Sequence, residues 1–90
     1  MKDAVLRPAP DLAWVVETRG LTLVRRRGGA FASIPYPHAG LWAILADGSY
    51  TPERARNLLA LLLSIDEKAA ERELVQTLAA WQEAGLIVIS

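Results

Sequence analysis

The chain offers few side chains that could carry out covalent chemistry. His38 is its one histidine, and no acid–base partner is evident near it. Metal ligands and catalytic triads need companions, so we predict neither role for His38. Asp47 is followed by Gly48, a pair typical of a helix end rather than of a catalytic carboxylate. The sequence has no cysteine, which excludes a thiolate nucleophile and disulfides. We therefore expect a protein that is not an enzyme and that uses no cofactor and no metal.

Arg25, Arg26 and Arg27 form the one run of like charge. A guanidinium group binds a carboxylate through two parallel hydrogen bonds, so this run could hold an acidic stretch of a peptide. The alternative is a solvated hairpin tip whose charges keep a sheet edge from aggregating. From the residues alone we favour the hairpin tip.

The charge is balanced overall but unevenly distributed. Residues 1–34 carry six basic and three acidic side chains, and residues 35–90 carry four and seven. A neutral total argues against a nucleic-acid partner, which requires many phosphate-neutralising side chains. No apolar signal core follows the N-terminus, and the longest apolar run, Leu58 to Leu63, is too short to span a bilayer. We expect a soluble, cytoplasmic protein without a membrane partner.

Three short strands are predicted in the first third of the chain. Residues 1–11 contain two prolines and no clean period, so we expect an extended lead-in. Period-two alternation and turn residues then predict strands over 12–18, 21–26 and 30–34. The alternation places Leu12, Trp14 and Val16 on one face. The three strands should form an antiparallel meander.

Three helices are predicted after the strands. The first starts at Pro37 and stops near Gly48; the second has Thr51 as its N-cap and Pro52 in its first turn. The third starts at Asp66 and runs to about Glu83, and residues 86–89 are predicted as a terminal strand or an extended tail. With 90 residues, 52% of them hydrophobic, we expect one α+β domain over residues 1–90, in a winged helix-turn-helix-like arrangement. The three tryptophans are expected in the core or in a groove wall.

Several short motifs occur together in this order of elements. They are Arg7-Pro8, the Gly28-Gly29 turn, Leu41-Trp42-x-Ile44-Leu45-x-Asp47-Gly48-x-x-Thr51, and Leu78-x-x-Trp81-x-x-x-Gly85-Leu86-Ile87. With them the chain resembles the PqqD-like family of small winged-helix-like domains, also called RiPP recognition elements. Order and spacing over almost the whole chain carry this resemblance, because no single motif is specific. Tyr36-Pro37 stands where the family commonly has Leu-Asn.

The resemblance implies a peptide chaperone of natural product biosynthesis. It implies that the leader segment of a ribosomally synthesised precursor peptide pairs antiparallel with the edge of the third strand. The leader's side chains would enter a groove against the third helix, while a separate modifying enzyme (a radical-SAM protein, a cyclase or a peptidase) acts on the precursor. The implied peptide-binding residues are Arg25, Arg26, Ala30, Phe31, Ala32, Ser33, Ile34, Glu71, Leu74, Val75, Leu78 and Gln82.

The residues themselves leave other interpretations open. Ala30, Ala32 and Ser33 are small enough for a neighbouring strand to approach closely, whereas the position of the apolar residues on the third helix, taken alone, favours a packed core. A winged helix could bind DNA, but residues 66–84 carry five acids against two bases, and such a helix would repel phosphate. The run from Leu58 to Leu63 is apolar almost all round at Leu61, so it should be buried or meet a partner. A dimerisation or interaction module, with a homodimer at that surface, is the remaining alternative.

Overall fold

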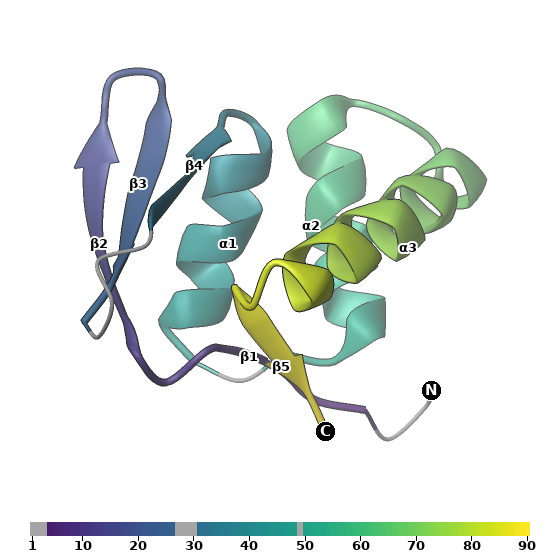
Figure 1. The fold of residues 1–90 in the computed structure, drawn as a ribbon. Coiled ribbons are helices and arrows are strands. Elements are labelled where there is room, and N and C mark those ends of the chain that lie inside the picture. The colour runs from purple at the N-terminus through teal and green to yellow at the C-terminus, as the bar shows by residue number, and fades with distance from the viewer. Residues whose placement is uncertain (1–3, 27–30, 49) are drawn as a thin grey trace.

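The computed structural model describes residues 4–26, 31–48 and 50–90. Ala30 and the predicted turn at Gly28-Gly29 lie outside these residues. The elements, in chain order, are β1 (Leu6–Pro8), β2 (Leu12–Glu17), β3 (Gly20–Arg25), β4 (Phe31–Pro35), α1 (His38–Ala46), α2 (Pro52–Leu63), α3 (Glu67–Glu83) and β5 (Ile87–Ile89) (Figure 1). The fold is the predicted α+β arrangement of a three-stranded antiparallel sheet, three helices and a short C-terminal strand.

Strands β2, β3 and β4 form the predicted meander, with β3 in the centre. The register pairs Trp14 with Leu23, and Leu23 with Ala32, so these side chains share one face of the sheet. Helix α1 contacts β3 and β4, and Leu21 and Leu23 are buried. Figure 1 shows β2 as the strand farthest from the helices.

The position of β2 explains an exposure that the alternation pattern did not predict. Leu12, Trp14 and Val16 lie on the face of Leu23, as expected, but only Leu12 is buried. Trp14 is 42% exposed and Val16 is 65% exposed. The Trp14 ring meets the buried Trp42 ring edge to face, with 5.2 Å between centroids. Beyond that contact, α1 does not cover β2.

A second, two-stranded sheet corrects the expectation of an extended lead-in. Strand β1 pairs antiparallel with β5, with Leu6 opposite Ile89, and Leu6 also forms a bridge to Tyr50. The side chain of Leu6 is fully buried. A three-residue strand that ends in a proline has no visible period, and its partner comes from the other end of the chain. The sequence therefore gave no local signal for it.

The helix ends follow the capping residues that the sequence offered. The side chain of Thr51 accepts a hydrogen bond from the Arg54 amide (3.3 Å), and that of Asp66 accepts one from the Ala69 amide (2.8 Å). These side chains satisfy amides that the first turn of a helix leaves without partners. Helix α1 ends at Ala46, close to the predicted stop.

Trp42 joins the helices to the C-terminal strand. Its side chain is fully buried, and its indole N–H donates to the Leu86 carbonyl (3.2 Å). Trp81 is buried as well, so two of the three tryptophans lie in the core. Leu61 is 78% exposed, so the part of the chain that the structure describes leaves this side chain of α2 uncovered, although Leu59 beside it is buried. None of the helices in the described ranges is long and apolar enough to cross a membrane.

Candidate functional site

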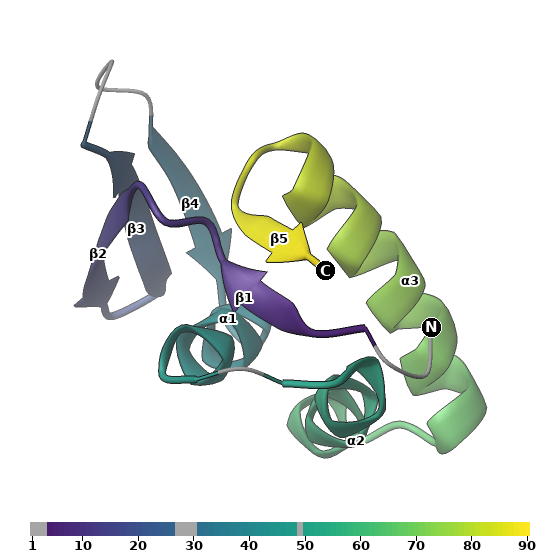
Figure 2. The same cartoon turned by 90° about the horizontal axis from the view of Figure 1, so that it is seen from below.

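Strand β4 presents a free edge toward the side of the sheet that carries the helices (Figure 2). In an antiparallel ladder, alternate residues turn both N–H and C=O toward the same neighbour. The Tyr36 amide donates to the Arg19 carbonyl (3.1 Å), so Ala32 and Ile34 also bond toward β3. Ser33 lies between them and turns its N–H and C=O to the free side. An incoming extended segment would find these groups available.

The side chains along β4 suit close approach by another strand. Ser33 is exposed and Ala32 is half-buried on the opposite face, whereas Ile34 is buried in the core. Neither Ala32 nor Ser33 extends far from the backbone. Phe31 begins the strand, and Ala30 lies outside the described residues. The structure thus brings Ala32, Ser33 and Ile34 together at one edge, as their neighbouring positions dictate.

Two side-chain contacts tie the region around β4 to helix α3. At the end of β3, the Arg25 guanidinium donates to the Ala84 carbonyl (2.8 Å). A cation is favourable there, because a helix C-terminus carries partial negative charge and unpaired carbonyls. Arg25 and the neighbouring Arg26 are both exposed. Of the two predicted arginines, Arg25 is held by this contact, whereas Arg26 makes no side-chain hydrogen bond or ion pair among the described residues.

The second contact corrects the expectation that His38 has no acidic partner. His38 Nε2 lies 2.9 Å from Glu73 Oε1. The two residues are far apart in sequence, so only the fold reveals the pair. Within the described ranges, no three side chains of the metal-binding types come together. The pair is a side-chain contact between α1 and α3.

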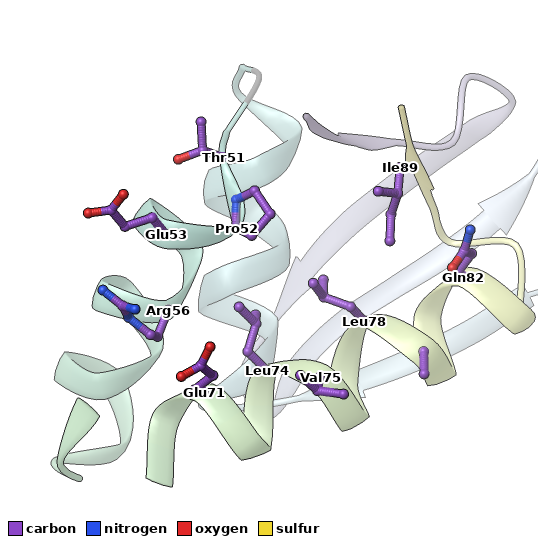
Figure 3. Close-up of a pocket in the computed structure, with 11 residues that line it drawn as sticks. Thr51, Pro52, Glu53, Arg56, Glu71, Leu74, Val75, Leu78, Gln82 and Ile89 are labelled. Atoms are coloured by element: carbon purple, nitrogen blue, oxygen red, sulfur yellow. The ribbon is translucent and has the colours of Figure 1, made fainter. Parts of the chain in front are cut away.

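The five predicted residues of α3 line one pocket between α2 and α3, with a volume of about 600 Å³. Figure 3 shows Leu74 and Leu78 pointing from α3 toward Pro52 and Ile89. The lining residues are Thr51, Pro52, Glu53, Arg56, Glu71, Leu74, Val75, Leu78, Ala79, Gln82 and Ile89. None of them belongs to β4, so the pocket and the strand edge are separate places.

Helix geometry explains why the β4 edge and the α2–α3 pocket are two separate places rather than the single groove that was expected. On an α-helix, residues three or four apart share a face. Glu71, Leu78 and Gln82 therefore lie on the side of α3 that lines the pocket, with the exposed Val75 at its margin, while Glu73 and Ala84 lie on the side that contacts His38 and Arg25. Leu74 and Leu78, which the sequence predicted on the apolar side of α3, are buried, whereas Val75 is 63% exposed. The pattern did not show which neighbouring element each side of the helix would meet.

The chemistry of the pocket is that of an apolar binding surface with a charged rim. Leu74 and Leu78 are buried, whereas Val75 is exposed. Glu53 and Glu71 stand at the rim, and Arg56 is paired with Glu67 (2.9 Å) outside it. Such a surface can hold apolar side chains.

Comparison with known proteins gives matches in structure alone. No protein-family model matches the sequence, and no curated protein does. The fold is similar to that of lasso peptide synthetase B1 complexed with the leader peptide, with a TM-score of 0.76 and 20% identity, over 92% of this chain and 96% of that one. It is also similar to TbiB1 in complex with the TbiA(beta) leader peptide, with a TM-score of 0.78 and 18% identity, over 90% and 93% of the two chains. At these identities the likeness shows a shared fold.

Proposed function

We propose that this protein is a non-catalytic chaperone for the leader segment of a ribosomally synthesised precursor peptide. The leader would add as an antiparallel strand to β4, and the protein would present the precursor to a separate modifying enzyme. The observation that carries the proposal is the free backbone of Ser33 on an edge lined by small side chains. The shared fold with two proteins in complex with leader peptides supports it. Within this proposal the chain is a member of the PqqD-like family.

In strand addition, the affinity for the peptide and the specificity for its sequence come from different groups of the protein. Main-chain hydrogen bonds to β4 supply affinity for any extended segment, and neighbouring side chains select among sequences. One set of the leader's side chains would face the Glu73 side of α3. Arg26, which is exposed near the start of β4, would favour an acidic residue at that end of the leader. Arg25 would act through its contact with Ala84, by holding α3 at its distance from the sheet.

The pocket between α2 and α3 is a second candidate place for peptide contact. Its floor of Leu74 and Leu78, with the exposed Val75 beside it, would accept apolar side chains of a leader that continues beyond the strand. Glu71 and Gln82 would contact the backbone or polar side chains at the rim. Amide shifts confined to β4 would limit the site to the strand edge, and shifts that include these five residues would extend it.

The proposal is tested by blocking the outward-facing amide of Ser33 at the centre of β4. Ser33→Pro removes the N–H that faces the free side but no hydrogen bond to β3, and edge strands tolerate proline at such positions. The ligand is the synthetic leader segment of a precursor encoded beside this gene, titrated into the isotopically labelled protein. We expect its binding to weaken by at least about tenfold, since a backbone hydrogen bond and close approach are both lost.

A matched control lies on the other edge of the sheet. Val16→Pro makes the same change on β2 and should leave the affinity for the leader within about twofold of the unaltered protein, because β2 takes no part in the proposed site. If the unaltered protein shows no shifts in residues 31–35 or in α3 on titration, the proposed function is wrong. It is equally wrong if both proline variants bind the leader as well as the unaltered protein does.

A further inference from the structure

The outer edge of β2 is a second unpaired backbone edge, and no element of the described chain covers it. Glu17 pairs with Gly20, and the Arg26 amide donates to the Asp11 carbonyl (3.0 Å), so the odd-numbered residues of β2 bond toward β3. Trp14 and Val16 consequently turn their N–H and C=O outward. The backbone of β2 is as ready for strand addition as that of β4.

The side chains of β2 lack the devices that usually protect such an edge. Natural edge strands carry lysine, proline or inward-pointing charges that discourage pairing. Between Asp11 and Glu17 this strand carries no charge and no proline. Trp14, Val15 and Val16 are 42%, 58% and 65% exposed, respectively. An apolar edge of this kind is expected to be covered by another strand.

We propose that a second copy of this chain covers it, with the two β2 strands paired antiparallel about a two-fold axis. A two-fold axis at Val15 sets Trp14 opposite Val16 of the partner subunit. These two residues turn their backbone groups outward on both copies, so the ladder can close. The apolar faces of the two sheets would then be continuous, and the exposed ring of Trp14 would pack on a valine.

Charge selects this register over its neighbour. With the axis at Val15, Asp11 lies beside the Thr18-Arg19 turn that follows the partner's β2, where the long side chain of the partner's Arg19 can reach it, and this juxtaposition occurs twice by symmetry. Both residues are exposed, and neither forms an ion pair within the described ranges. Moving the axis to Trp14 would instead set Asp11 opposite the partner's Glu17, and like charges directly opposite one another are unfavourable. The sequence of β2 is thus complementary to itself in one register.

The dimer would be weak, and it would leave the proposed peptide site open. A contact between two six-residue strands is smaller than the roughly 1,200–2,000 Å² buried in stable interfaces, so we expect a dissociation constant on the order of 10–100 μM. The joined sheet would have six strands, with β4 of each copy at the two outer ends. Each dimer would therefore bind two peptides.

Sedimentation equilibrium of the full chain, from about 5 μM to about 1 mM, tests the proposal. We expect a monomer–dimer equilibrium for the unaltered protein and for Ser33→Pro, and a monomer throughout for Val16→Pro. Asp11→Arg and Arg19→Asp are exposed changes that should each weaken self-association, since like charges then face one another. An equimolar mixture of these two variants should form a heterodimer, because both facing pairs become opposite in charge.

Three results would overturn the proposal: a monomer at every concentration, a dimer that survives Val16→Pro, or charge variants that associate no better when mixed than alone. A dimer lost on Leu61→Glu but kept in Val16→Pro would place the interface on α2 instead. Circular dichroism of each variant verifies that the fold is intact. The result is independent of the proposed function, since leader binding is read from β4 and self-association from β2.

Discussion

The two edges of the sheet offer the same backbone groups in different surroundings. At β4, Ala32 and Ser33 are small, and the contacts of Arg25 and His38 hold α3 near the strand. At β2, Trp14 and Val16 are large and exposed, and β2 is the strand of this sheet that lies farthest from the helices (Figure 1). An incoming strand would meet a helix wall at β4, whereas at β2 it would meet only a flat apolar surface.

This difference determines whether an edge can select one peptide sequence or can only pair with an extended strand through its backbone. Backbone hydrogen bonds do not distinguish one sequence from another, so an edge selects its partner through the side chains that line it. The edge at β4 has a neighbouring helix with which to select, which suits a particular peptide. The edge at β2 has its own side chains alone, which suits a partner of identical sequence. We expect the two edges to respond independently to mutations, unless the mutation lies in the strand that they share.

The largest expected effect is on the shared central strand. Leu23 is fully buried in β3, and Leu23→Ala should lower the free energy of unfolding by about 2–4 kcal/mol, because it leaves a cavity in the core. Urea denaturation measures the loss. The adjacent Val24 is 40% exposed, and Val24→Ala should cost less than about 1 kcal/mol. Equal losses for the two variants would contradict the assignment of the buried face, and with it the faces of both edge strands.

An intermediate effect is expected at Gly20, where the backbone of β4 leaves no room for a side chain on β3. A Cβ atom on Gly20 would collide with the backbone at the Ile34 carbonyl oxygen and Pro35 Cα. Gly20→Ala should therefore cost about 1–3 kcal/mol and shift β4 away from β3. Calorimetry measures the stability, and peptide titration should show weaker binding at β4.

Gly40 provides the matched control for that glycine substitution. It lies inside α1, and a Cβ there would touch only the Leu62 side chain, at 3.5 Å. Gly40→Ala should stabilise the protein by about 0.5–1 kcal/mol, because alanine is the better helix former. If both alanine variants destabilise the protein to the same extent, close approach at Gly20 is not what limits substitution.

Much of this fold was predictable because its signals are local. Thr51 and Asp66 precede helices that start where capping residues predict, and the antiparallel order of three strands follows from turns between apolar runs. Strand β1 was not predictable, because its partner β5 is at the other end of the chain and neither strand has more than three residues. A pairing of that kind is determined by the packed helices between the two strands.

The small residues of β4 and the apolar residues of α3 could be located from the sequence, but their arrangement in space could not. Small residues marked β4, and an apolar stripe marked α3. Which side of α3 faces the sheet depends on how the helix packs, and the pairing of His38 with Glu73 depends on the same packing. The exposure of Trp14 and Val16 could not be predicted for a similar reason. Alternation shows which residues share a face of the sheet, but not how much of that face the helices cover.

The smallest expected effect compares two glutamates on opposite sides of α3. Glu73 contacts His38, whereas Glu71 stands at the rim of the α2–α3 pocket and makes no ion pair among the described residues. Alanine substitution removes one negative charge and raises helix propensity equally at both positions. Because the contact of Glu73 is partly exposed, Glu73→Ala should be less stable than Glu71→Ala by only about 0.5 kcal/mol.

The two alanine variants should differ more clearly in binding than in stability. Loss of the contact with His38 frees α3 to move relative to β4, so Glu73→Ala should weaken leader binding about two- to fivefold, a cost of 1 kcal/mol or less. Glu71→Ala should leave the affinity unchanged if the leader stays on β4, and self-association through β2 should be the same for both. A larger loss with Glu71→Ala would instead place the leader in the pocket between α2 and α3, and would make that side of the helix the selective one.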